Sequence, residues 1–424
     1  MRFEPLRRAA LTAAQGLLLA GVFALGWMKT PVPIGGLPAV ASDLLLALSF
    51  ACLAIAIVCG ARPRWHRAQW FLLAYFAALA LSALFSADPG RSAVKLATQA
   101  YLLSLPLLVL NLVPDPQAMR RLFLAWIGGA AVVTALGVAT LLLFPFLGWD
   151  SILAWPLHHF GTLPPGNYPR LELTFLYPSI LANYLAVALM LVLLCGVLGW
   201  IRPRVANGLA AAMVLVAFFA LTPGFGAIVL MLAAWFAHRW RRTRPVIAAA
   251  SLMIGVGFAL LALPVAAVTP ILHPTAPFVF NFDLAGVQVT LAPAVRMLTW
   301  IDAWHRFLDS PLLGRGIGVN AAFVQFLTPE GDLATLTDAH NMFLNVAAQA
   351  GALGLAGIVA ILWFAVRRAL APSSDVVFAL ALAFACSLGV QGLVGSFEDS
   401  RHLWLLFGLL LAADSWREQG RGAG

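Results

Sequence analysis

Charged residues are scarce in this sequence. Asp, Glu, Lys and Arg together make up 10% of the 424 residues, whereas 62% of the residues are hydrophobic. A water-soluble core of this size does not require so large an apolar fraction. The composition therefore excludes a soluble globular enzyme and predicts an all-α integral membrane protein.

Cysteine is also rare, and several chemical motifs are missing. The four cysteines all lie inside apolar runs, so they indicate neither a disulfide framework nor a zinc site. The sequence has no Asp-x-Asp pair, no Walker loop and no His-x-x-x-His pair. These absences argue against a soluble nucleotide donor, and we predict no metal and no cofactor.

The apolar runs themselves contain almost no ionisable residues. Asp43, near one end of its run, is the main exception. An ion-coupled transporter usually needs such groups near the membrane midplane, so transport is a minority alternative. The net charge of +9 is explained by arginines on the loops of a membrane protein, and no nucleic-acid partner is predicted.

Runs of roughly 17–25 apolar residues are long enough to cross a bilayer as helices. Twelve spans are predicted, and residues 208–237 count as two because Pro223 and Gly224 break that run into a hairpin. The chain then divides into spans one to nine, a loop, and the last three spans with a cytoplasmic tail, at residues 1–269, 270–339 and 340–424. The twelve predicted spans are 9–27, 38–61, 69–86, 96–113, 122–147, 171–200, the two arms of 208–237, 246–269, 340–366, 374–396 and 402–414.

Basic residues predict the orientation of these spans. Of the 26 lysines and arginines, 18 fall on the side that carries both termini, which is the cytoplasmic side by the positive-inside rule. Topology disfavours positive charge on the outer side, so the remaining eight include candidates for a functional role. These eight are Lys29, Arg91, Lys95, Arg170, Arg296, Arg306, Arg315 and Arg401.

The outward loop at residues 270–339 is the largest predicted piece outside the membrane, and long loops tend to be functional. Apolar residues recur at helical spacing from Val295 to Leu308, which predicts an amphipathic helix. Its stripe could lie on the membrane surface or pack on the bundle, and a structural lid with solvated arginines is the alternative.

The charge of this loop limits what it can bind. Its three arginines are outnumbered by six acidic residues, so it is not a basic patch. An anion would have to be bound by a few individual guanidinium groups, which bind phosphate oxygens in a bidentate manner, rather than attracted by a general positive field. The following PLLGRGIG stretch has glycines for a tight turn, but no strand precedes it, so it does not indicate a dinucleotide site.

His340 stands where this loop meets the tenth span. Asp338 and Asn341 flank it and are each able to orient an imidazole, which makes His340 a candidate general base for a hydroxyl. The alternative is a helix cap with a hydrogen-bonded ring. Arg170 is expected to enter the sixth span from outside, and an acidic and basic group follows span eleven. That group, Glu398, Asp399, Arg401 and His402, either lines the same outward cavity or forms an ordinary turn in which Arg401 pairs with Glu398 or Asp399.

Four stretches together resemble the O-antigen ligase family, within the wider group of O-antigen polymerases and protein oligosaccharyltransferases. They are RLELTFLYPSILANYLAVAL from Arg170, VRMLTWIDAWHRFLDSPLLGRGIG, DAHNMFLNVAAQAGALGLAG and SFEDSRHLWLLFGLL. One departure is visible at the hairpin turn. Relatives often carry a Ser-Arg pair there, whereas this sequence has Gly224 and Phe225.

The resemblance implies transfer of a glycan from undecaprenyl diphosphate to a lipid A core sugar at the outer face of the bacterial inner membrane. It implies a metal-independent, inverting reaction with His340 as the base and Arg170 and Arg296 on the diphosphate, and with Arg315 and Arg401 as further candidates. Asp338, Asn341 and Glu398 would support them. Membrane lipids surround the spans, and an apolar groove would hold the polyprenyl chain. O-antigen polymerase, protein oligosaccharyltransferase and lipid-linked glycan transporter remain alternatives.

Overall fold

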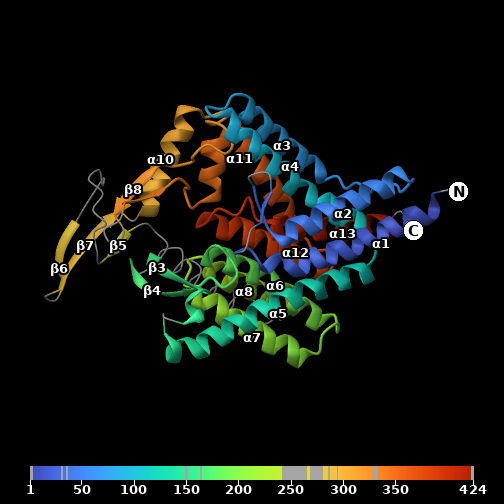
Figure 1. The fold of residues 1–424 in the computed structure, drawn as a ribbon, viewed down its shortest axis with the longest axis horizontal. Helices are drawn as coiled ribbons and strands as arrows, with labels where there is room; N and C mark the ends of the chain where they lie inside the picture. The colour runs from blue at the N-terminus through green and yellow to red at the C-terminus, as the bar shows by residue number, and fades with distance from the viewer. Residues whose placement is uncertain are drawn as a thin grey trace.

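The structure is a computed structural model. It describes residues 3–29, 32–34, 37–148, 151–162, 165–240, 265–267, 280–284, 287–293, 295–327 and 333–421. Long helices lie side by side in a bundle, and short strands gather at one end of it (Figure 1). In order, the helices of the bundle are α1 Glu4–Phe23, α2 Ala41–Val58, α3 Gln69–Leu84, α4 Pro89–Leu112, α5 Pro116–Leu147, α6 Pro178–Val197, α7 Pro203–Phe219, α8 Phe225–Arg239, α11 Met342–Leu370, α12 Asp375–Phe384 and α13 Arg401–Arg421.

Seven helical segments within these ranges are long and apolar enough to cross a membrane. Three shorter apolar helices, α3, α7 and α8, correspond to further predicted spans, and α13 covers the last one. The chain is therefore a mostly helical, multi-pass membrane protein. Of the predicted ninth span, 246–269, only residues 265–267 are described, and they form strand β5 Val265–Ala267.

The middle of the bundle is formed by the helices that are apolar on every side. In α6, and in the segment Asp375–Leu393 that continues α12, 78% of the most apolar window is buried inside the protein. A helix that is hydrophobic all round needs neighbours on every side, and these two satisfy that need by packing on each other and on α7, α11 and α13. The segment Ala385–Val390 after α12 is a π-helix, a local widening that often marks a functional site.

Polar caps define where several helices begin. The side chains of Asp88, Asp115 and Ser374 each accept a hydrogen bond from a backbone N–H in the first turn of α4, α5 and α12. Such caps satisfy amides that have no partner inside the helix. The caps Asp88 and Asp115 stand directly before α4 and α5. The loops that precede these two helices are only a few residues long.

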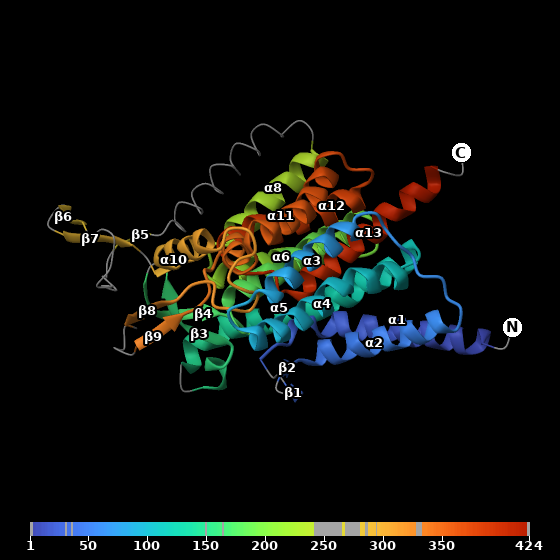
Figure 2. The same cartoon turned by 90° about the horizontal axis from the view of Figure 1, so that it is seen from above.

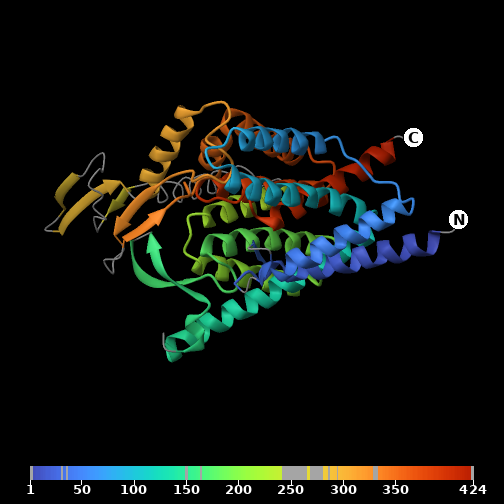
Figure 3. The same ribbon diagram turned by 45° about the horizontal axis from the view of Figure 1, so that its top comes forward.

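The two ends of the bundle differ. Both termini lie at one end, whereas the strands and α10 Val295–Asp309 lie at the other, in each of three views (Figures 1, 2 and 3). The helix α10 appears where the sequence predicts an amphipathic helix. Its buried positions are small ones, Thr299 and Ala303, while Trp304 and Leu308 are about half exposed, at 48% and 54%.

The strands are not anticipated by an all-α prediction. They form antiparallel hairpins, β1 Val32–Ile34 with β2 Leu37–Ala39, β3 Leu157–Thr162 with β4 Pro165–Leu171, and β8 Val324–Leu327 with β9 Leu333–Leu336, and a three-stranded sheet in the order β5, β7 Val287–Pro293, β6 Phe280–Leu284. The predicted start of the sixth span at residue 171 is wrong. Residues 165–171 pair with β3 instead, and α6 begins seven residues later at Pro178 because Pro is favoured in the first helical turn.

A kink in α11 holds the loop that follows α10. Gly351 has φ +64° and ψ −164° inside the helix, which opens its hydrogen-bond ladder. The loop supplies the missing partners, since Arg315 N–H donates to Ala348 O at 3.0 Å and Ala352 N–H donates to Pro311 O at 2.8 Å. A Cβ on Gly351 would lie 2.3 Å from the Leu312 carbonyl, so only glycine fits this contact.

Candidate functional site

Arg296 lies in the first turn of α10 and reaches the bundle. Its guanidinium NH1 donates to the carbonyl oxygen of Val394 at 3.0 Å. In the described part of the chain, no carboxylate lies within ion-pair distance of Arg296. Burial, with the positive charge of Arg170 nearby, lowers the pKa of Arg296 to about 10, and Asp338 opposes the shift. Arg296 therefore stays charged at neutral pH in a partly dehydrated position.

Arg170 reaches the same region from a different element. It lies near the end of β4, opposite His158 on β3, and is buried with 8% of its surface exposed. Its Nε donates to the carbonyl oxygen of Ala220, at the hairpin turn between α7 and α8, at 3.1 Å. The expectation that Arg170 enters α6 is wrong, because β4 carries it to the hairpin turn. Two like charges, Arg170 and Arg296, are thus held near each other.

Asp338, Asn345 and Ser396 form a closed hydrogen-bond network beside these arginines. The amide nitrogen of Asn345 donates to Asp338 Oδ2 at 2.6 Å and to Ser396 Oγ at 2.7 Å, and Ser396 Oγ donates to Asp338 Oδ1 at 2.7 Å. The Asn345 carbonyl oxygen accepts from Ala339 N–H at 2.8 Å. The network fixes the chain on either side of His340.

His340 has a backbone conformation that is uncommon for a side chain other than glycine, with φ +50°. Its N–H donates to Asp338 Oδ1 at 2.5 Å, which stabilises the turn. The ring Nδ1 lies 3.6 Å from the same oxygen, longer than a hydrogen bond, and 38% of the side chain is exposed. Strain of this kind is concentrated at functional sites and is maintained here by the surrounding network.

The environment of His340 favours the neutral imidazole. Burial lowers the pKa of His340 below its ordinary value, the nearby Asp338 carboxylate opposes the shift, and Arg296 reinforces it. A neutral imidazole can accept a proton at neutral pH, as a general base must. The Asp338 carboxyl group lies 3.6 Å from Nδ1, where it attracts an imidazolium without forming a hydrogen bond to the ring.

The cap of α11 is Asn341 rather than His340. The Asn341 side chain accepts hydrogen bonds from Phe343 N–H at 3.0 Å and Leu344 N–H at 3.1 Å. The helix start is therefore satisfied without the imidazole. Asn341 anchors the helix, and His340 is left with its ring outside the cap.

Glu398 and Asp399 lie in the loop before α13 and have different partners. Glu398 Oε1 accepts from Asn345 at 3.3 Å, while its buried Oε2 has no partner in the described residues. Burial raises the pKa of Glu398 to about 8, with Asp399 and Asp338 adding to the shift and Lys95 opposing it. Asp399 pairs with Lys95 and accepts from Gln99 at 2.6 Å. Glu398 therefore joins the network as a neutral acid.

Arg401 and His402 turn away from this network. Arg401 forms a bidentate ion pair with Asp43 of α2, with NH2 2.6 Å from Asp43 Oδ2. His402 Nε2 lies 2.6 Å from Asn183 Oδ1 inside the bundle. The alternative in which Arg401 pairs with Glu398 or Asp399 is wrong, since the helix start turns its side chain toward α2.

Arg315 also lies apart. It is exposed on the loop held by the α11 kink, and in the described residues its side chain has no hydrogen bond or ion pair. Three other outward basic residues are engaged structurally. Lys29 is 2.6 Å from Glu172, Arg306 is 2.7 Å from Asp302, and Arg91 donates to the Asn320 side chain at 3.2 Å.

Several residues of the network are missed by sequence reasoning. Asn345 and Ser396 connect two segments about fifty residues apart, and no spacing rule joins them. Asn345 does carry a signal, because it is a polar residue on the first turn of an apolar span, one helical turn after Asn341. Glu172, which binds Lys29 and His158, stands in the quoted RLELTFLYPS stretch and gives no separate signal.

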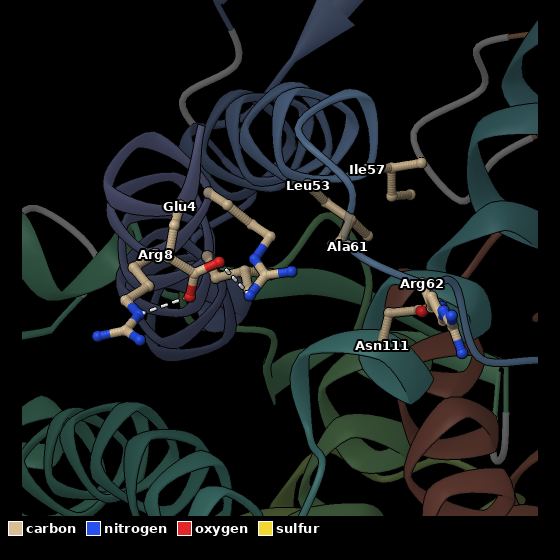
Figure 4. Close-up of a pocket in the computed structure, with 9 residues that line it drawn as sticks. Glu4, Arg8, Leu53, Ile57, Ala61, Arg62 and Asn111 are labelled. Carbon is tan, nitrogen blue, oxygen red and sulfur yellow. Dashed lines mark hydrogen bonds and ion pairs between the residues drawn. The ribbon is translucent and has the colours of Figure 1, made fainter. Parts of the chain in front are cut away.

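The arrangement has no metal centre in the part of the chain that is described, where no three His, Cys, Asp or Glu side chains are grouped to hold an ion. A cleft of about 350 Å³ lies elsewhere, at the end with the termini (Figure 4). What the candidate site offers is an imidazole whose surroundings favour the neutral form, the Asp338 carboxyl group and the guanidinium groups of Arg170 and Arg296.

Residues 209–359 match the sequence profile of the O-antigen ligase family. The resemblance to the O-antigen ligase family is confirmed. The matched segment contains Arg296, Arg315, Asp338, His340 and Asn341, whereas Arg170, Glu398 and Arg401 lie outside it. No curated protein matches this chain significantly. The match supports an activity of the O-antigen ligase or polymerase type.

Proposed function

We propose that the protein is an O-antigen ligase, which transfers a glycan from undecaprenyl diphosphate to a lipid A core sugar at the periplasmic face of the bacterial inner membrane. One observation carries the proposal. His340, whose environment favours the neutral imidazole, lies beside Asp338 and Arg296, and Arg296 lies near Arg170, within and next to the segment that matches the ligase family. Both termini are then cytoplasmic, in agreement with the distribution of basic residues.

The two arginines suit the leaving group. As the bond between the anomeric carbon and the diphosphate oxygen breaks, its electron pair leaves with undecaprenyl diphosphate. Positive groups that are already in place and partly dehydrated stabilise this developing charge strongly. Arg296 fits this role because a carbonyl oxygen holds its guanidinium group without cancelling its charge, and Arg170 is held close by through Ala220 O.

His340 suits the acceptor. The acceptor hydroxyl oxygen attacks the anomeric carbon from the face opposite the diphosphate, so the configuration inverts. Its proton passes to Nε2 of His340, and the Asp338 carboxylate then faces the positive imidazolium across Nδ1. Such proton transfer contributes about 10²–10⁴-fold to a rate. No metal takes part in this scheme.

The departure at the hairpin turn has a structural counterpart. Gly224 and Phe225 stand where relatives often carry Ser-Arg, and no arginine comes from the turn itself. Arg170 arrives there from β4 and binds Ala220 O at the end of α7. We infer that β4 supplies the guanidinium group that the turn lacks.

Other acceptors define the alternatives. An O-antigen polymerase has the same kind of donor but extends a second lipid-linked glycan, and a protein oligosaccharyltransferase uses a polypeptide. We prefer the ligase to these alternatives because of the groups that surround His340. A lipid-linked glycan transporter would need the polar groups inside the bundle, such as Asn183 with His402, and would not need His340.

Reconstitution tests the proposal. Purified protein in liposomes is given undecaprenyl diphosphate glycan and lipid A core in EDTA, and the glycosylated core is separated on a gel. The unchanged protein is expected to produce a ladder, and His340→Ala to reduce the initial rate at least 100-fold.

His305→Ala is the matched control, because His305 is an exposed histidine on α10 in the same outward region. It is expected to keep the full rate. Elongation of the lipid-linked glycan without modification of the core would show that the protein is an O-antigen polymerase and not a ligase. Full activity of His340→Ala in a folded protein would remove His340 from the chemistry.

A further inference from the structure

A second feature lies at the opposite end of the bundle. The cleft of about 350 Å³ opens between the start of α1, the end of α2 and the end of α4 (Figure 4). Its lining divides into a basic rim and an apolar floor. The residues that line it are Glu4, Arg7, Arg8, Leu11, Leu53, Ile57, Ala61, Arg62 and Asn111.

The rim has an excess of positive charge. It carries three arginines and one glutamate. Glu4 is already paired with Arg7 and with Arg8, the latter at 2.8 Å, so it does not neutralise Arg62. The Arg62 side chain is exposed and has no hydrogen bond or ion pair within the described ranges. An anion in this cleft would meet at least one uncompensated guanidinium group.

The floor is apolar and continues along α2. Leu53 is buried at 6% exposure, and Ile57 borders the opening at 37%. Beyond the cleft, Ile55 and Val58 of the same helix are exposed at 46% and 87%. A ligand with an anionic head and an apolar tail fits a basic rim followed by an apolar floor better than a free anion does.

Two tryptophans near the cleft indicate its position relative to the membrane surface. Trp65 lies in the connection between α2 and α3, and Trp70 lies in the first turn of α3. They are exposed at 50% and 63% and lie edge to face with ring centroids 5.5 Å apart. Exposed tryptophans gather at the membrane–water interface, at the level of lipid headgroups. The arginine rim therefore lies where phosphodiester groups are located.

We propose that this cleft binds the headgroup of an anionic phospholipid of the cytoplasmic leaflet. Arg62 and Arg7 contact the phosphodiester oxygens, and the acyl chains lie along Leu53, Ile57 and the exposed face of α2. Basic pockets between helices on the cytoplasmic side are suited to anionic headgroups. The site is independent of the proposed glycan transfer.

Native mass spectrometry of the full chain in mild detergent tests this site, with phosphatidylglycerol or phosphatidylcholine added. The unchanged protein is expected to retain phosphatidylglycerol in preference to phosphatidylcholine. Arg62→Gln should weaken the apparent affinity for phosphatidylglycerol about fivefold, and Arg7→Gln/Arg62→Gln about 25-fold. Arg62→Gln breaks no contact in the described structure, so its folding is not at risk.

Arg204→Gln is the control, since Arg204 is exposed at the start of α7, on the same predicted side and outside the cleft. It should leave lipid retention unchanged. Equal weakening by Arg204→Gln would show a general surface field and overturn the proposal, as would unchanged retention in the double variant. Displacement of the lipid by equimolar glycerol phosphate would also overturn it, in favour of a free phosphate site.

Discussion

Arg401 differs from the pair Arg170 and Arg296, although all three arginines were expected to bind the same diphosphate. Arg401 is neutralised by Asp43 in a bidentate ion pair, with side chains 20% and 15% exposed. Arg170 and Arg296 are held by the carbonyl oxygens of Ala220 and Val394. A carbonyl dipole positions a guanidinium group but leaves its net charge in place, so Arg296 is free to attract an anion in a way that the neutralised Arg401 is not.

The comparison separates two uses of outward positive charge in a membrane protein. A pair such as Arg401–Asp43 connects two helices that are distant in sequence, α13 and α2, and contributes to stability. Two like charges near each other, as at Arg170 and Arg296, repel, and such pairs are expected where charge serves a function. The predictions below test whether function and stability divide along this line.

The largest effect is expected from removing the charges held by carbonyl oxygens. Arg296→Gln and Arg170→Gln should each lower the rate of glycan transfer by about 10²–10³-fold, because a group that stabilises transition-state charge is lost. The initial rate in liposomes measures this. For Arg296→Gln, unfolding should change little, since the lost hydrogen bond is a single one to a backbone carbonyl.

Arg306→Gln is the control for Arg296→Gln, because Arg306 lies on the same helix and pairs with Asp302 at 2.7 Å. It should keep the rate within about twofold, because the charge of Arg306 is already neutralised by Asp302. A loss equal to that of Arg296→Gln would mean that the position of α10, rather than the charge of Arg296, limits transfer.

Arg401→Gln should act on stability instead. Breaking one side of a mostly buried ion pair leaves Asp43 without its partner and is expected to cost about 2–4 kcal/mol of unfolding free energy. Denaturant titration in detergent micelles measures this cost. The double variant Asp43→Asn/Arg401→Gln should be less destabilised than Arg401→Gln alone. A rate loss of 100-fold in folded Arg401→Gln protein would place Arg401 with Arg170 and Arg296.

The acidic limb of the pH–rate profile should shift when Asp338 is changed. Transfer needs neutral His340, whose pKa lies below its ordinary value of 6.5, so the rate should fall as pH decreases below that value. Asp338 opposes the lowering of this pKa. Asp338→Asn should therefore lower the pKa of His340 further and move the acidic limb to lower pH, together with a smaller maximal rate. An unmoved limb would show that His340 is not the titrating base.

The last prediction concerns Glu398 and the pH dependence of unfolding. Because the pKa of Glu398 in the folded protein is raised to about 8 from 4.5, the folded state binds a proton that the unfolded state has lost. Stability should thus decrease as pH rises from about 4.5 to 8 and become level above 8. Glu398→Gln should flatten this decrease, and thermal unfolding in detergent across that range measures the difference. An identical slope in Glu398→Gln would rule out the shift.

Much of the fold could be predicted from the sequence because membrane helices are coded locally. Long apolar runs mark α1, α2, α4, α5, α6, α11 and α12, and the break at Pro223 and Gly224 separates α7 from α8. The helical spacing from Val295 to Leu308 marks α10. The strands have no such signal, since β3 and β4 are short and carry no alternating pattern over most of their length.

The residues of the candidate site could be proposed from the sequence. The groups that each of them contacts could not. His340, Asp338 and Arg296 are visible as polar residues beside apolar spans. Whether an arginine meets a carboxylate or a carbonyl depends on helix rotation, which the sequence does not specify. Asp43 is 358 residues away from Arg401 in the chain, and no local rule connects them.

The kink at Gly351 has a consequence for how this protein can diverge. The loop from Pro311 to Gly316 is attached to α11 by backbone hydrogen bonds, which do not depend on side-chain identity. Arg296 before this attachment and His340 after it therefore keep their spacing whatever the length of the β8–β9 hairpin between them. Insertions and deletions in that hairpin are therefore tolerated without separating Arg296 from His340.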